Sequence, residues 1–245
     1  WLIVVLISGI NLLVYYLSRL FGTKRGILLV GLFGGFFSST STLISLASKS
    51  KHTKDKILVK KYAGGAIMAT GISFLLAGIL FAVTNFELFV YVLPLLLSML
   101  LTGIIVGGYL ITRKDGESSE NVHEIEYETF SLGPALKFVG LIILITLVIQ
   151  IMQNLNINES LIILFTGISG LLGIDAPIIA ISNLTSTGSI TLVAALAAFL
   201  FTNTTNLIGK SIYSRTLGNA IFFKYTSIGL LIVALAGFAS LIFIL

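Results

Sequence analysis

Eight apolar stretches, each about as long as a membrane-spanning helix, limit this 245-residue chain to very few folds. With 56% hydrophobic and only 10% charged residues, the chain differs from soluble domains, in which about a quarter of the residues are charged. The sequence therefore predicts an all-α integral membrane protein. The stretches are residues 2–20, 26–48, 62–84, 87–111, 135–153, 160–183, 190–208 and 221–244.

The positions of the basic residues favour six spanning helices over eight. If residues 26–48 and 160–183 are re-entrant hairpins that enter and leave on one face, all 15 Lys and Arg residues fall on the same side, as expected for cytoplasmic loops. Eight plain crossings remain an alternative, because both stretches are long enough to span the bilayer. The basic residues would then divide almost evenly, one side carrying Arg19, Lys24, Arg25, Lys210, Arg215 and Lys224.

Three crossings and one hairpin in each half would give the two halves opposite orientations in the membrane. This is the inverted-topology repeat found in many secondary transporters. The glycine-rich segment 31–42 has a degenerate counterpart at 167–177, which supports an internal duplication. We therefore expect a first membrane repeat at 1–111, an acidic cytoplasmic linker at 112–134 and a second membrane repeat at 135–245.

Helix-breaking residues lie midway along both candidate hairpins. Glycine lets the backbone turn at low steric cost, and proline removes a helical hydrogen bond. Broken backbone at membrane depth is tolerated only where protein or a water-filled cavity surrounds it, so we expect both tips to be buried and close to each other. The predicted backbone hinges are Gly34, Gly35, Gly170, Gly173 and Pro177.

A run of hydroxyl side chains follows the first pair of glycines: Ser38, Ser39, Thr40, Ser41 and Thr42. A half-helix that begins here would direct its free N–H groups and the positive end of its dipole at the hairpin tip. Such a tip can hold an anion through N–H groups, or a dehydrated cation through hydroxyl and carbonyl oxygens. The alternative is that these small residues only cap the helix and let neighbouring helices approach closely.

Asp175 is the acid that the sequence places inside an apolar stretch, whereas every other acid lies in a predicted loop or at a helix end. An isolated carboxylate within lipid costs several kcal/mol, so it should be partnered, protonated or bound to a cation. No Lys or Arg is predicted at that depth. The repeat pairs Asp175 with Ser39, and Asn203 in a later polar run is a further candidate for the same site. Asp175 could also be a structural helix cap or a loop residue.

Several classes of chemistry are excluded by the composition. The chain has no cysteine, and His52 and His123 lie in charged loops, so the usual metal ligands are absent from the apolar stretches. A serine nucleophile needs a base within reach, and a catalytic acid pair needs two carboxylates. The sequence therefore predicts neither an enzyme nor a cofactor-binding or nucleic-acid-binding protein, and it leaves any metal site undefined.

Two motifs resemble a known family: GGFFSSTSTLISLA at residues 34–47 and SGLLGIDA at residues 169–176. They are similar to the paired signatures of domain of unknown function 4010, which commonly follows the MgtC/SapB domain in bacterial and archaeal membrane proteins. The resemblance implies a prokaryotic cytoplasmic-membrane protein and an MgtC-like domain before Trp1. Family members tend to carry a basic residue in the second halves of the crossings that here end at Val83 and Asn206, and the sequence shows none there.

These observations predict a transporter that moves a small ion through a mid-membrane site at the interface of the repeats. The expected ion is a cation, linked to protons, sodium or magnesium, with Asp175 as counter-charge or proton acceptor. A regulatory or assembly module that transports nothing is the first alternative, and an ion channel is the second. The expected partners are the lipid bilayer, the ion and a second copy of the chain.

Overall fold

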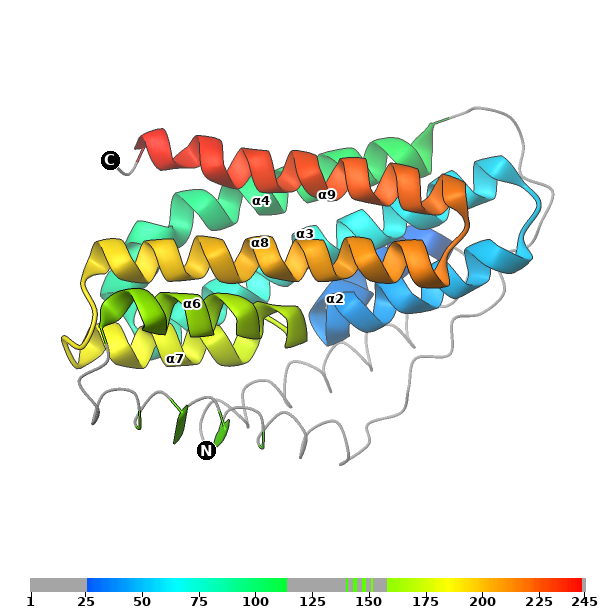
Figure 1. The fold of residues 1–245 in the computed structure, drawn as a ribbon. Coiled ribbons are helices and arrows are strands. Elements are labelled where there is room, and N and C mark those ends of the chain that lie inside the picture. Colours follow the sequence, from blue (N-terminus) through cyan, green and yellow to red (C-terminus); the bar gives the residue numbers. More distant parts are fainter. Residues whose placement is uncertain are drawn as a thin grey trace. The chain divides into compact units, whose positions relative to one another are not determined.

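The structure is a computed structural model that describes residues 26–113 and 158–243, with isolated positions between 140 and 151. Its regular secondary structure there is entirely helical (Figure 1), which confirms the predicted all-α class. The predicted stretches 2–20 and 135–153 and the acidic linker lie wholly or largely outside the described residues. The helices are α2 (Gly26–His52), α3 (Lys56–Thr84), α4 (Phe86–Thr112), α6 (Glu159–Ser169), α7 (Asp175–Ser186), α8 (Leu192–Leu217) and α9 (Ala220–Ser240), with short 3-10 helices η2 (Gly170–Leu172) and η3 (Leu241–Phe243).

Five of the described helices, α2, α3, α4, α8 and α9, are long and apolar enough to cross a membrane. The outward face of α4 is apolar along its length: Val90, Leu97, Leu101 and Ile105 are 45–67% exposed and recur at helical spacing. A continuous apolar surface of this kind is unfavourable in water. Helix length and hydropathy therefore make this a multi-pass membrane protein whose solvent is the lipid bilayer.

The described helices form two compact units. The first contains residues 26–75, 97–113 and 210–236, and the second contains residues 76–96, 158–209 and 237–243. Each unit thus draws on chain segments from before and after residues 112–134. The division of the chain into two repeats at that linker stays a prediction.

In the first unit, α2 is broken at Ser38. This residue has extended backbone (φ −172°, ψ 105°) between two helical arms, residues 26–37 and 39–52. Its hydroxyl oxygen accepts a hydrogen bond from the Ser41 N–H at 3.2 Å, which is the geometry of a helix N-cap. The second arm therefore begins in the hydroxyl run, where the sequence predicts a half-helix.

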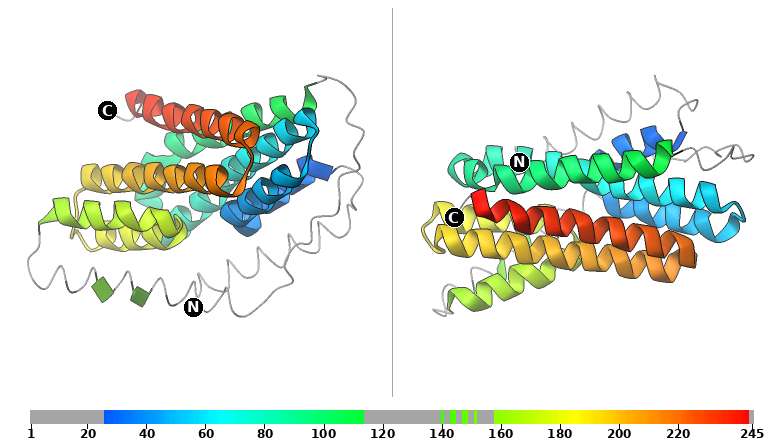
Figure 2. Two further views of the ribbon diagram at one scale, coloured as in Figure 1. Left: turned by 45° about the vertical axis from the view of Figure 1, so that its right-hand side comes forward. Right: turned by 90° about the horizontal axis from the view of Figure 1, so that it is seen from above.

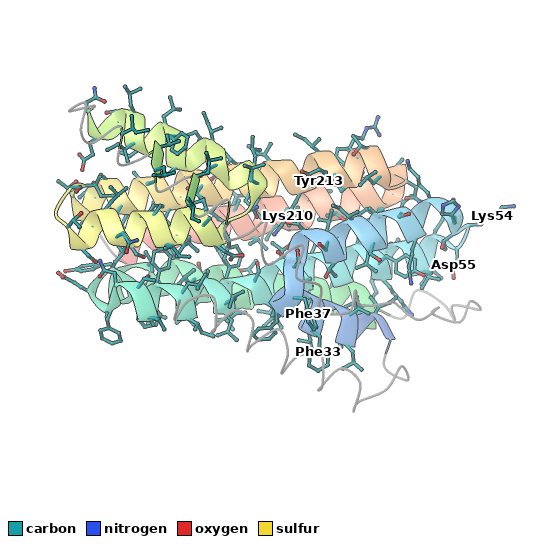
Figure 3. The ribbon with its side chains drawn as sticks, turned by 90° about the horizontal axis from the view of Figure 1, so that it is seen from below. Phe33, Phe37, Lys54, Asp55, Lys210 and Tyr213 are labelled. Carbon is teal, nitrogen blue, oxygen red and sulfur yellow. The ribbon has the colours of Figure 1, made fainter. Side chains whose placement is uncertain are left out.

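The two arms of α2 fold back on each other. Residues eight apart in a straight α-helix are separated by about 12 Å along its axis, yet a Cβ added at Gly34 would overlap the side chain of Thr42. Figure 3 shows Phe33 and Phe37 on the first arm, which lies at a steep angle to the second. Each arm is about 20 Å long or less at 1.5 Å per residue, shorter than the roughly 30 Å hydrocarbon core.

In the second unit, the predicted stretch 160–183 is two short helices rather than one. The helices α6 and α7 contain 11 and 12 residues and lie side by side (Figure 1, Figure 2). Each would extend only about 18 Å, so neither spans a bilayer alone. The connection needs glycine at Gly173, whose φ is +145°, because this region is strained for other residues.

The hinge residues have different structural roles from one another. Gly170 and Gly173 lie in the connection between α6 and α7, and Pro177 is in the first turn of α7, where proline is tolerated. Gly34 and Gly35 instead have helical backbone, and the first break lies at Ser38. The physical reason is that Gly35 is needed for packing: a Cβ there would lie 2.5 Å from the Ala69 carbonyl oxygen of α3.

Two asparagines each cap one helix and donate hydrogen bonds to residues near the end of α2 or of α7. In the first unit, Asn219 accepts a hydrogen bond from the Phe222 N–H at 2.8 Å, which caps α9, and its Nδ2 donates to the Ser50 carbonyl at 2.7 Å near the end of α2. In the second unit, Asn85 accepts from the Leu88 N–H at 2.9 Å, which caps α4. Its Nδ2 donates to the Ser182 carbonyl at 3.3 Å and to the Ser186 hydroxyl at 3.0 Å in α7.

We expect Asn219→Ala to lower the free energy of unfolding by about 1–3 kcal/mol, because it removes a helix cap and leaves a partly buried carbonyl without this donor. The measurement is thermal unfolding of the detergent-solubilised protein. The control is Asn183→Ala, a substitution at an exposed position of α7. Equal midpoints for the two variants would contradict this role for Asn219.

Candidate functional site

The most unusual side chain in the described structure is Lys210, which is only 2% exposed. The sequence predicts that the crossing ends at residue 208 and puts Lys210 in a basic surface loop, and this prediction is wrong. Helix α8 continues to Leu217, so Lys210 lies within the helix. The helix can continue because the ammonium has a polar partner inside the protein. The hydropathy of neighbouring residues in the sequence gives no information about such a partner.

Lys210 is hydrogen-bonded to the hydroxyl run of α2. Its Nζ donates to the Ser39 Oγ at 2.9 Å, and Ser39 is itself 9% exposed. Figure 3 shows where Lys210 lies on its helix, with Tyr213 one turn further on. A buried ammonium is costly unless hydrogen bonds and charges compensate for lost water, and Ser39 is one of the groups that do so. This hydrogen bond within the first unit connects Lys210 of α8 to the residue that follows the break in α2.

The five predicted hydroxyls have different neighbours in the described structure. Ser38 caps the second arm of α2, and Ser39 accepts from Lys210. Thr42 packs against Gly34. Thr40 is half-buried and Ser41 is exposed. Ser39 is therefore the hydroxyl of this run that is both buried and joined to a charged group.

Asp175 is the first residue of α7 and is half-buried. A carboxylate in the first turn is favoured by the helix dipole, so its position is compatible with the structural role as well as with an ion site. The residue before it, Ile174, supplies no side-chain cap. Asp175 belongs to the second unit, and its predicted proximity to the hydroxyl run stays a prediction.

The polar run around Asn203 mostly holds the end of α6. Three side chains of α8 donate to carbonyls that α6 leaves exposed at its C-terminus: Thr202 to Thr166 at 3.0 Å, Thr205 to Gly167 at 2.5 Å and Asn206 to Gly170 at 3.0 Å. Asn203 itself is 1% exposed and Asn206 is 6% exposed. Asn203 and Asn206 are thus buried residues of the second unit.

The available groups limit the chemistry. Among the described residues, no group of three or more His, Cys, Asp or Glu side chains could hold a metal ion. The hydroxyl and carbonyl oxygens near the break in α2 are suited to hard cations, and the Lys210 amine can bind and release a proton.

Comparison with protein families relates the chain to others. Residues 5–218 match the family described as domain of unknown function (DUF4010). The chain is a member of the DUF4010 family. This confirms the family resemblance of its two motifs, and the family description assigns no reaction to the DUF4010 fold. No curated protein and no solved structure matches the chain.

Family membership makes the position of Lys210 more informative. The resemblance implies a basic residue in the second half of a crossing, and the apolar stretch ending near Asn206 shows none. In the structure of this DUF4010 protein the helix is longer, and Lys210 lies in the second half of α8. One signal in the sequence could have found it: no glycine or proline interrupts residues 210–217 before Gly218.

Proposed function

We propose that this DUF4010 protein transports a small cation across the membrane through a site at the break in α2. The single observation that carries the proposal is the buried hydrogen bond between Lys210 and Ser39. Ionisable residues inside membrane helices are costly, and they commonly mark ion or proton pathways. Broken helices in transporters supply free backbone groups and hydroxyls to such sites.

In this proposal, α2 and the pair α6–α7 are re-entrant, and six other segments span the membrane. The break at Ser38 and the shortness of α6 and α7 support it. The two folded-back elements belong to inverted-topology repeats. The asparagine caps support such a duplication, since Asn85 caps α4 and bonds to α7, while Asn219 caps α9 and bonds to α2.

Glycine contacts support the same duplication. In the first unit, Gly31 and Gly35 of α2 approach backbone carbonyls of α3, and an added Cβ would lie 3.1 Å from the Gly65 oxygen or 2.5 Å from the Ala69 oxygen. In the second unit, a Cβ added at Gly170 would overlap the Thr202 carbonyl of α8. Each broken element thus packs closely against the helix that follows it in its own half of the chain.

The proposed ion ligands are oxygen atoms of the run Ser38–Thr42, with Asp175 and Asn203 contributed by the second repeat. Asp175 would balance the charge of the cation or accept a proton. In this proposal the protein lies in a cytoplasmic membrane with its basic loops inside, and the resemblance to prokaryotic proteins with an MgtC/SapB domain supports that location. It also predicts an MgtC-like domain in the same parent chain.

The test is cation uptake by proteoliposomes that contain the full chain. We expect Asp175→Asn and Ser39→Ala to abolish gradient-coupled uptake, because each removes an oxygen ligand or a charge needed by the bound cation. Glu87→Gln is the matched control, since Glu87 is an exposed acid in the first turn of α4. Normal insertion of all variants is checked by gel filtration in detergent.

The other functions give different results in the same assay. Uptake that never saturates with concentration and needs no second gradient would indicate a channel. A wild-type protein that moves no cation, with Asp175→Asn fully functional in cells, would refute transport and indicate a regulatory or assembly module.

A further inference from the structure

The geometry points to an exchange of one proton for one monovalent cation, in which the Lys210 ammonium occupies the cation site when no cation is bound. This inference rests on the proposed transport function and deepens it. It names the substrate class, an alkali-metal cation, and the group whose proton is exchanged.

The competition follows from the chemistry of one oxygen atom. A serine hydroxyl has two acceptor lone pairs and one donor hydrogen. In the structure, the Ser39 Oγ accepts from the Lys210 ammonium at 2.9 Å. A metal cation bound to the same oxygen would lie beside that ammonium, and two like charges in a buried site repel strongly. The Ser39 Oγ can therefore accept a hydrogen bond from protonated Lys210 or bind a cation, but it cannot do both at once.

The charge balance selects the class of cation. When protonated Lys210 releases its proton to water, the neutral amine remains and the site loses one positive charge. Binding of one alkali-metal cation restores that charge, so the buried region keeps the same net charge throughout. A divalent cation would add a further positive charge to a region where uncompensated charge is costly. The exchange is therefore expected to be one proton for one monovalent cation.

The other described ionisable groups of the first unit are distributed over α2, α3, α4, α8 and α9 and the turn between α2 and α3. The Asp55 carboxylate accepts from the Ile57 N–H at 2.7 Å at the start of α3, and Lys60 lies over the Tyr225 ring at 5.6 Å. Tyr213 lies on α8 one turn from Lys210. The remaining described groups are Lys49, Lys51 and His52 on α2, Lys54 in the turn after it, Lys56, Lys61 and Tyr62 on α3, Tyr109 on α4 with Arg113 just after it, Arg215 on α8 and Lys224 and Tyr225 on α9.

The test uses proteoliposomes that contain the full chain and a trapped pH indicator. Addition of Na⁺, K⁺, Rb⁺ or Li⁺ outside should make the lumen more alkaline for at least one of these ions, because cation entry drives proton exit. Magnesium chloride should produce no such change. The rate should not depend on an imposed membrane potential, since the exchange moves no net charge.

Two substitutions at Lys210 distinguish competition between its ammonium and the cation from a purely structural role of this side chain. Lys210→Met removes the proton-binding group but keeps an apolar chain of similar length, so proton counterflow should be lost while isotopic cation–cation exchange continues. Lys210→Arg keeps a permanent charge that cannot be released, so both activities should be lost. Lys224→Met is the control, because Lys224 is an exposed lysine of α9, and it should behave as wild type.

The outcomes distinguish this inference from the proposed function. Proton counterflow that persists in Lys210→Met would overturn the inference and leave cation transport standing. Loss of cation–cation exchange in a well-folded Lys210→Met protein would also overturn it, because Lys210 would then be needed for binding. Proton counterflow driven equally by magnesium would refute the monovalent class. A wild-type protein that moves no cation at all would instead refute the proposed function.

Discussion

Cysteine introduced at Lys54 is expected to react with a membrane-impermeant maleimide from one side of the membrane, and cysteine introduced at Thr187 only from the other side. Lys54 lies in the turn between α2 and α3, and Thr187 lies just after α7; both positions are exposed. The chain has no native cysteine, so each variant carries a single reactive thiol.

The physical reason for opposite labelling is the number of crossings between the two positions. In the six-crossing topology, α3, α4 and the apolar stretch 135–153 cross the membrane, whereas α6 and α7 enter and return on one face. Three crossings place Thr187 opposite Lys54. If residues 160–183 crossed as well, four crossings would place the two positions on the same side.

The measurement is labelling in oriented membrane vesicles before and after permeabilisation. Lys224→Cys is an internal reference, because α8 is the single crossing between Thr187 and this exposed position, and it should be labelled together with Lys54→Cys. Labelling of the Lys54 and Thr187 variants from the same side would refute the re-entrant assignment of α6 and α7.

A single methyl group at Gly35 or at Gly170 is expected to destabilise the protein markedly. A Cβ at Gly35 would lie 2.5 Å from the Ala69 carbonyl oxygen, and one at Gly170 would overlap the Thr202 carbonyl. These neighbours are helical backbone, which cannot move aside as a flexible side chain can. Overpacking of this kind costs about 1–3 kcal/mol, which exceeds the roughly 0.5–1 kcal/mol that alanine gains over glycine in a helix.

Glycines with free space give the matched controls. A Cβ at Gly78 would lie 3.6 Å from Leu96, and one at Gly209 would lie 3.5 Å from Leu171, which are ordinary van der Waals distances. We expect Gly78→Ala and Gly209→Ala to unfold at the wild-type temperature or above it, and Gly35→Ala and Gly170→Ala to unfold well below it. A common midpoint for all four variants, measured in detergent, would show that these close approaches are not needed.

Much of the architecture could be predicted because it depends on local chemistry. Long apolar runs without charges specify membrane helices, and glycines flanked by hydroxyls specify a break with a new helix start. The structure has such a start at Ser38 and a glycine-containing connection at Gly170–Gly173. The position of the first break could not be predicted to the residue, because Gly34 and Gly35 are equally good local hinges. Their role depends on how closely α3 approaches.

The sequence by itself determined that this chain is a helical membrane protein of the DUF4010 family, because hydropathy and motif are properties of the chain alone. Glycine spacing predicted two interrupted helices but left uninterrupted crossings as an alternative. Only the tertiary structure decided what the polar residues contact. Lys210 has the sequence neighbours of an ordinary loop lysine, and nothing in the sequence near Asn219 indicates that its side chain reaches Ser50. A buried ammonium or a long-range cap is stable only when a group distant in sequence meets it, and folding brings Ser39 to Lys210.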